Sequence, residues 1–245
     1  MRWIRSLATW TFAVVWTALI LGSSVVVSVL TLGLLRHRLI NVAGPAWAWP
    51  VLWVAGIRMD LHGMEHLAGR QARLLVMNHQ SIIEILAIAA MSVPGFSPLG
   101  KKQIKWVPAF GQAWWALGGH FVDRGHHKKA VGSLQRLAQD MKRHGLTAVI
   151  APEGTRSRTG QLQKFKMGAF HLAIDVGVPM VPVVFHNGFQ LCRPDSLLVQ
   201  PGTFWVDVHP PIDTSSWTRD GLRAQADALH DRYAAWLAAG PLPRS

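Results

Sequence analysis

The chain has 245 residues, with 25 Lys or Arg against 13 Asp or Glu, so its formal net charge is +12. Half of the residues are hydrophobic and only 16% are charged, a composition that excludes an intrinsically disordered protein. The single cysteine, Cys192, excludes an internal disulfide framework and a cysteine-rich zinc site.

The N-terminal part of the chain has long stretches without charge. Residues 6–35 and 39–57 contain no charged side chain. A helix over the first stretch would be about 45 Å long, more than the roughly 30 Å hydrocarbon core of a bilayer. The second stretch contains two prolines and three tryptophans, which is typical of a helix at the membrane interface. We therefore predict that residues 1–58 form membrane-anchoring helices.

The way in which these helices meet the membrane stays open. Arginines stand at both ends of the first stretch, so the excess of positive charge on the cytoplasmic side does not select one orientation. A single tilted span and a hairpin that dips in from one side both satisfy the pattern. A cleaved signal peptide does not, because its apolar run would be only about 7–15 residues long.

Residues 59–245 alternate between short apolar runs and amphipathic segments. This alternation predicts an α/β domain with a mostly buried mixed sheet flanked by helices. The predicted strands cover residues 73–77, 119–122, 147–150, 180–185 and 203–208. The predicted helices cover residues 82–90, 128–144 and 169–176, and a last helix follows residues 214–216.

Two short patterns resemble known sites and are rejected. Residues 95–102 nearly form a phosphate-binding loop, but Lys102 stands where a hydroxyl is needed and Pro98 lacks an N–H. His126 and His127 are adjacent, so they cannot face one metal ion from a helix. We expect neither a metal site nor a bound cofactor.

His79 is the strongest candidate for catalysis. It follows an apolar strand and precedes a helix, a position where a neutral imidazole can be partly exposed and accept a proton. Glu84, five residues later, could orient the ring and stabilise its protonated form. Ser81 and Glu84 also fit a helix capping box, in which the glutamate bonds the serine N–H. Spacing alone leaves both roles of Glu84 open.

Three further segments place polar residues at strand ends. Asp123 and Arg124 end one predicted strand, residues 151–158 follow another, and residues 178–183 begin a third. In an open α/β sheet, ligands bind beyond the carboxyl ends of the strands. Arginines such as Arg124 and Arg156 suit a phosphate there, and a histidine base beside them suits deprotonation of a hydroxyl on the same molecule.

Together these segments resemble the 1-acyl-sn-glycerol-3-phosphate acyltransferases. Four family blocks occur in order between about residues 61 and 186, and the resemblance identifies His79 as the histidine of the H-x4-D motif. It implies that Arg124 binds the phosphate of the acceptor, and that the last block serves the acyl chain or the fold. One position departs from the family, since Glu84 replaces the usual aspartate. The third block implies acceptor-site roles for Glu153, Gly154, Thr155 and Arg156.

The expected reaction is a direct acyl transfer. His79 takes the proton of the 2-hydroxyl of lysophosphatidic acid, and the oxygen attacks an acyl thioester as co-substrate, either acyl-CoA or an acyl group carried on acyl carrier protein. Backbone N–H groups near residues 153–154, or a lysine, would stabilise the oxyanion. Lys102 is a candidate for the acceptor site.

Residues 101–145 carry nine basic and two acidic side chains, with tryptophans among them. This pattern favours contact with anionic membrane lipids. We expect a membrane-associated enzyme whose catalytic domain lies on the cytoplasmic face of the inner or plasma membrane. Two alternatives remain: an acyltransferase for another lysophospholipid or a lyso-aminolipid, and a non-catalytic basic protein that binds membranes or nucleic acid. We expect no nucleic-acid partner, since a non-catalytic protein leaves the His79 segment and residues 153–156 without a function.

Overall fold

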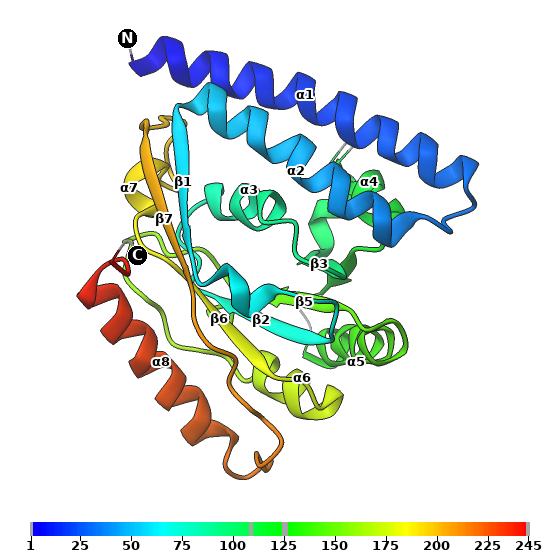
Figure 1. Cartoon of the computed structure of the whole chain (residues 1–245), viewed down its shortest axis with the longest axis vertical. Helices are drawn as coiled ribbons and strands as arrows, with labels where there is room; N and C mark the ends of the chain where they lie inside the picture. The colour runs from blue at the N-terminus through cyan, green and yellow to red at the C-terminus, as the bar shows by residue number, and fades with distance from the viewer. Residues whose placement is uncertain (1, 108–109, 124–126, 244–245) are drawn as a thin grey trace.

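The computed structural model describes residues 2–107, 110–123 and 127–243. Two long helices, α1 (Arg2–Leu30) and α2 (Arg36–Ala55), form a hairpin at the N-terminus (Figure 1). Tryptophan side chains hold the pair together, because Trp47 donates a hydrogen bond to Thr17 Oγ1 at 2.8 Å and Trp16 donates to the carbonyl of Ala46 at 3.0 Å. Among the described residues, α1 is the one helix long and apolar enough to cross a membrane.

Seven strands of the described chain form one mixed sheet in the order β1-β7-β6-β2-β5-β3-β4. Neighbouring strands are parallel except β6 and β7, which are antiparallel. The strands are β1 (Ile57–His62), β2 (Arg73–Met77), β3 (Phe96–Lys101), β4 (His120–Val122), β5 (Thr147–Ile150), β6 (Met180–Phe185) and β7 (Gly202–Val208).

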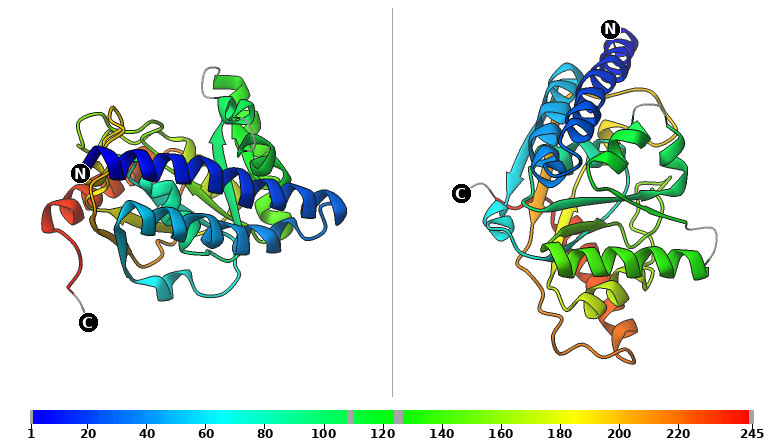
Figure 2. Two further views of the ribbon diagram at one scale, coloured as in Figure 1. Left: turned by 90° about the horizontal axis from the view of Figure 1, so that it is seen from above. Right: turned by 90° about the vertical axis from the view of Figure 1, so that its right-hand side faces the viewer.

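Helices cover both faces of the sheet, as two views at right angles show (Figure 2). The remaining helices are α3 (Ile83–Ala90), α4 (Phe110–Ala116), α5 (His127–His144), α6 (Gly168–Val176), α7 (Gly188–Leu191) and α8 (Leu222–Ala239), with short 3-10 helices η1 (Met64–Leu67) and η2 (Lys102–Trp106).

The apolar core divides into two layers because strand side chains alternate between the faces. Leu75 and Met77 of β2 pack with residues of α2 and α3 on one face. Leu74 and Val76 pack with residues of α5, α6 and α8 on the other. All five residues of β2 are buried, as expected for a central strand covered on both sides.

The structure confirms the predicted fold and all five predicted strands, with shifts of one residue at some ends. Two strands were missed, β1 and β3, and so were the short helices α4 and α7. The last helix begins at Leu222, several residues beyond the predicted start after residues 214–216. The domain boundary predicted between residues 58 and 59 falls inside β1. The rejected phosphate-loop segment forms β3 rather than a loop.

Candidate active site

His79 lies directly beyond the carboxyl end of β2, where β2 and β6 are joined by a side chain. The amide of Asn78 is fully buried; it donates to the carbonyl of Phe185 at 2.8 Å and accepts from the N–H of Phe185 at 2.8 Å. This pair of bonds continues the pairing of the two strands past the end of β2, because Phe185 is the last residue of β6. The backbone is therefore fixed one residue before the histidine.

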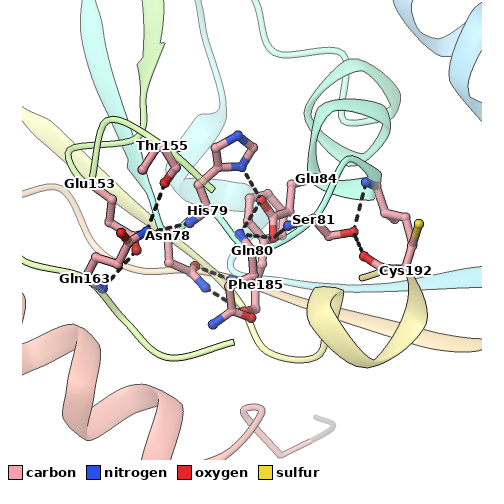
Figure 3. A network of polar contacts seen from close by, with 11 residues as sticks. Asn78, His79, Gln80, Ser81, Glu84, Glu153, Thr155, Gln163, Phe185 and Cys192 are labelled. Atoms are coloured by element: carbon pink, nitrogen blue, oxygen red, sulfur yellow. Dashed lines mark hydrogen bonds and ion pairs between the residues drawn. The ribbon is translucent and has the colours of Figure 1, made fainter. Parts of the chain in front are cut away.

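The ring of His79 is held by Glu84. Nδ1 of His79 lies 2.6 Å from Oε2 of Glu84, and the other ring nitrogen, Nε2, faces away from the glutamate (Figure 3). The Glu84 side chain has no exposed surface, whereas 16% of the His79 side chain is exposed. An ionised carboxylate accepts the Nδ1 proton and thereby leaves the lone pair of Nε2 directed toward a ligand.

Glu84 also caps the start of α3. Its carboxylate accepts the N–H of Gln80 at 2.8 Å and the N–H of Ser81 at 2.9 Å. Burial raises the pKa of Glu84, while the bonds from His79 and from these N–H groups act in the opposite direction. The two roles that spacing left open are thus geometrically compatible, because one carboxylate contacts both the ring and the helix start.

The loop after β5 holds the backbone of His79 through two hydrogen bonds, one to its N–H and one to its carbonyl. Oε1 of Glu153 accepts the N–H of His79 at 2.6 Å, and the carbonyl of His79 accepts the N–H of Ser157 at 2.8 Å. The other oxygen of Glu153 accepts the N–H of Gln163 at 2.9 Å. Burial raises the pKa of Glu153 to about 7. Both oxygens of Glu153 are therefore engaged within the protein.

The hydroxyl of Tyr233 is inserted between β2 and β6 on the other face of the sheet. In a regular parallel ladder with this register, the N–H of Val183 would bond the carbonyl of Val76 directly. Instead that N–H donates to Tyr233 Oη at 3.1 Å, and the hydroxyl donates to the carbonyl of Val76. Burial raises the pKa of Tyr233 well above its ordinary value, so the hydroxyl keeps its proton. This bridge sets the spacing of the strands two residues before Asn78.

Two glycines leave room for the site. A Cβ on Gly188 would lie 2.8 Å from Oε1 of Glu84, so this position makes space for the glutamate. Gly154 has φ of 78°, a left-handed conformation that favours glycine, and a Cβ there would lie 2.7 Å from Nζ of Lys166. Gly188 was missed in the sequence because its role depends on contact with Glu84, more than one hundred residues away.

An apolar cavity of about 320 Å³ opens at His79. His79, Thr155 and Arg156 form a polar part of its wall, while side chains of α1, α2, α3, β3 and α4 form most of the rest. Residues on the apolar part include Leu21, Ile40, Trp47, Ile85, Ile88 and Leu117. The cavity thus joins a histidine and an arginine to a long apolar surface under the helical hairpin.

The other predicted site residues have different surroundings. Thr155 and Arg156 are exposed and share the cavity wall with His79. Lys102 is half exposed and lies 3.3 Å from Asp123, outside the cavity lining, whereas its neighbour Lys101 does line the cavity. Arg124 lies outside the described residues. Among the described residues, no group of three or more His, Cys, Asp or Glu side chains is arranged to hold a metal ion.

The chain is similar in sequence to a known acyltransferase family. The acyltransferase family pattern matches residues 58–186. The 1-acyl-sn-glycerol-3-phosphate acyltransferase of Limnanthes douglasii is 30% identical over 95% of this chain and 82% of its own length. The chain belongs to the 1-acyl-sn-glycerol-3-phosphate acyltransferase family. The enzyme of that name from Cocos nucifera is also 30% identical over 81% of this chain, which spans 64% of that relative's length.

A solved structure shares the fold of this acyltransferase. The crystal structure of the 1-acyl-sn-glycerophosphate acyltransferase PlsC from Thermotoga maritima superposes with a TM-score of 0.82, covering 99% of this chain and 98% of that one. The two sequences are 22% identical. The shared fold includes the N-terminal helices, since the superposition spans nearly the whole chain.

Proposed function

We propose that this acyltransferase moves a fatty acyl group from an acyl thioester to the 2-hydroxyl of lysophosphatidic acid, which forms phosphatidic acid. The contact between Nδ1 of His79 and the buried Glu84 carries the proposal, because it fixes one tautomer of the histidine at the mouth of an apolar cavity. The names of the relatives supply the acceptor.

In the proposed reaction, Nε2 of His79 takes the proton of the acceptor hydroxyl. The hydroxyl oxygen then attacks the thioester carbonyl, the carbon–sulfur bond breaks, and the thiol of the donor leaves with a proton returned from the histidine. Glu84 stabilises the positively charged ring between these two steps. No covalent enzyme intermediate is needed.

Arg156 is the proposed ligand of the acceptor phosphate, together with Arg124. A guanidinium binds a phosphate through two parallel hydrogen bonds, and Arg156 stands on the same cavity wall as His79. Glu153 supports the site indirectly, by holding the backbone of His79, rather than by contact with substrate. The N–H of Gly154 bonds the carbonyl of Ala151, so it does not serve the oxyanion; the cation of Lys101 on the cavity wall is better placed.

The apolar cavity is the proposed site of an acyl chain. Its walls are aliphatic and aromatic side chains from α3, β3, α4 and the helical hairpin. Each methylene buried there contributes about 0.8 kcal/mol of binding free energy. A bound chain would thus place its carbonyl end beside His79 while its hydrocarbon lies beneath the hairpin.

We further propose that the hairpin attaches the enzyme to a membrane, with the catalytic domain on the cytoplasmic face. Many large apolar side chains of α1 are exposed, including Trp3, Ile4, Leu7, Val14 and Leu19. An exposed apolar face of this extent favours burial in lipid. Anionic lipids suit the exposed Lys105 and Trp106 of η2, whose charged and ring groups lie 4.8 Å apart.

Replacing His79 by alanine tests the proposed function. Purified His79→Ala protein, assayed with lysophosphatidic acid and either acyl-CoA or the acylated form of acyl carrier protein, should lose turnover by about 1000-fold, within the range expected for a general base. His230→Ala, which removes a partly buried histidine on α8, is the matched control and should retain turnover. Normal turnover in His79→Ala would overturn the proposal, and the two donors show which thioester the enzyme uses.

A further inference from the structure

A second, polar cavity lies apart from the proposed active site. It has a volume of about 210 Å³, and Arg36, Trp115, His120, Asp140 and His144 contribute to its wall. These residues come from the start of α2, from α4, from β4 and from α5. None of them lines the larger cavity at His79. The cavity therefore has no part in the acyl transfer proposed above.

A hydrogen-bonded chain fixes one wall of this cavity. Nε2 of His120 lies 2.9 Å from Oδ2 of Asp140, and Nδ1 of His120 lies 3.0 Å from the hydroxyl of Ser97. The three residue types resemble a hydrolytic triad, but Ser97 is only 1% exposed and cannot reach a substrate. The chain instead orients the carboxylate of Asp140, whose side chain is 45% exposed.

The cavity carries charges of both signs. Arg36 supplies a guanidinium and His144 an imidazole N–H, which are donors suited to a phosphate. Asp140 supplies the opposite charge. Its contact with His120 uses Oδ2, so Oδ1 can accept a hydrogen bond from a ligand. A ligand with a phosphate and a nearby ammonium group matches this arrangement.

Exposed apolar side chains lie near the polar cavity and in the turn between α1 and α2. Trp115 on the cavity wall is 73% exposed, and Leu32 and Leu34, just before Arg36 in the chain, are 88% and 84% exposed. The hydroxyl of Ser28 near the end of α1 donates to the carbonyl of Ala116 at 2.9 Å, which joins the hairpin turn to the end of α4. A polar hollow beside such side chains suits an amphiphile whose acyl chains contact the leucines and the tryptophan.

We propose that this cavity binds the headgroup of a zwitterionic aminophospholipid. Arg36 and His144 hold the phosphate, and Oδ1 of Asp140 accepts a hydrogen bond from the primary ammonium. The acyl chains of the lipid run along the hairpin turn. This site is independent of His79, so its existence does not depend on the proposed reaction.

Lipid retention by the full-length protein tests the site. The protein is placed in nanodiscs of equal parts dioleoyl phosphatidylethanolamine, phosphatidylcholine and phosphatidylglycerol, released, and analysed by native mass spectrometry for retained lipid. The ethanolamine lipid should be retained about fivefold more than the choline lipid, whose quaternary nitrogen has no N–H for Asp140, a ratio on the scale of one exposed ion pair. Soluble glycerophosphoethanolamine in excess should not displace it, because the acyl chains contribute to binding.

Variants separate this site from general lipid binding. Asp140→Asn should remove the preference for the ethanolamine lipid, and Arg36→Gln should reduce the retention of all phospholipids. Asp227→Asn, which changes another exposed carboxylate, on α8, is the matched control and should bind as the wild type does. Equal retention of the three lipids by the wild type, preferential retention of the glycerol lipid, or an unchanged preference in folded Asp140→Asn would each overturn the proposal. Displacement by glycerophosphoethanolamine alone would overturn the part of it that concerns the acyl chains.

Discussion

Glu84 combines two requirements in one carboxylate. Three hydrogen-bond donors converge on it: Nδ1 of His79 and the N–H groups of Gln80 and Ser81. The H-x4-D motif that this segment resembles has aspartate here, and the longer glutamate finds space because Gly188 has no side chain. The ring orientation and the start of α3 therefore depend on a charged acceptor at this position.

Replacing Glu84 by glutamine should lower kcat by about 100-fold, at the low end of the range for general-base catalysis, with KM changed less than about threefold. Glutamine offers one acceptor oxygen, and its NH2 group would face another donor. Steady-state kinetics of Glu84→Gln and Glu84→Asp measure the effect. Glu84→Asp keeps the charge and should stay within about tenfold of wild type. Near-normal turnover in Glu84→Gln would show that the residue only caps α3, since glutamine also completes a capping box.

The raised pKa of Glu153 predicts a pH-dependent stability. Below pH 4.5, its ordinary value, the carboxyl group is protonated in both the folded and the unfolded chain. Between pH 4.5 and about 7, the folded protein keeps a proton that the unfolded chain releases, so the free energy of unfolding falls as pH rises. The contribution of Glu153 to this fall is about 3 kcal/mol, and it is complete above the folded pKa.

Chemical unfolding at pH 5 and pH 8 measures this contribution. Glu153→Gln cannot titrate, so its free energy of unfolding should fall less than that of the wild type over the same interval. Groups such as Asp207, which does not act on Glu153, are common to both proteins, and their contributions cancel in the comparison. Parallel pH profiles for the two proteins would contradict a raised pKa at Glu153.

Among the elements, α8 is connected to the strands that carry the active site through the hydroxyl of Tyr233, which bonds both β2 and β6. Tyr233→Phe should lower kcat about tenfold with KM within about threefold, because the loss of the bridge lets β2 and β6 shift before Asn78 and thus moves His79. It should also lower the free energy of unfolding by about 1–3 kcal/mol, since the N–H of Val183 and the carbonyl of Val76 lose a partner. Initial rates and unfolding curves of the same preparations measure both effects.

Trp236→Phe is the matched control for this prediction. Trp236 packs against Tyr233 on the same helix, with ring centroids 5.4 Å apart, so its truncation disturbs the packing of α8 without removing the bridge. Its kcat should stay near that of the wild type. An equal loss of kcat in both variants would assign the effect to helix packing in general.

The central elements could be predicted from the sequence because their patterns are local. The strands β2, β5 and β6 are uninterrupted apolar runs, as burial on both faces requires. β3 was missed because Pro98 and Gly100 are unusual inside a strand. β1 was missed because it is an edge strand with alternating polar residues and directly follows an apolar helix.

In the candidate site too, contacts between residues close in the sequence could be predicted, whereas contacts between distant segments could not. The spacing of His79 and Glu84 is local, so the sequence offered a contact between them beside the capping role, and Nδ1 and Oε2 lie 2.6 Å apart. The bonds from Glu153 to the backbone of His79 and from Tyr233 to β2 join segments 74 and 157 residues apart. Such bonds depend on strand order and register, which short patterns in one sequence do not define.

For the whole molecule, the position of α1 relative to the catalytic domain limits how the chain meets a membrane. Near its start, Ser6 Oγ accepts the N–H of Val199 at 3.0 Å and Trp10 donates to the carbonyl of Leu197 at 2.7 Å. Near its end, Ser28 bonds Ala116. The helix has 29 residues and is about 43 Å long, yet one domain contacts both of its ends. A helix held in this way lies along the domain, which favours the hairpin over a span.

Both ends of α1 should consequently be accessible from the side of the membrane that holds the catalytic domain. Single cysteines at Arg5 and Arg38, in a Cys192→Ser background, can be probed with a membrane-impermeant maleimide in intact spheroplasts and in inverted vesicles. A third variant, Asp227→Cys, reports the side of the catalytic domain, since this residue is exposed on α8. All three cysteines should react in the same preparation, because the hairpin enters and leaves the lipid on one face. Reaction of the cysteines at positions 5 and 38 in opposite preparations would establish a spanning helix and would require α1 to leave its contacts with Leu197 and Val199.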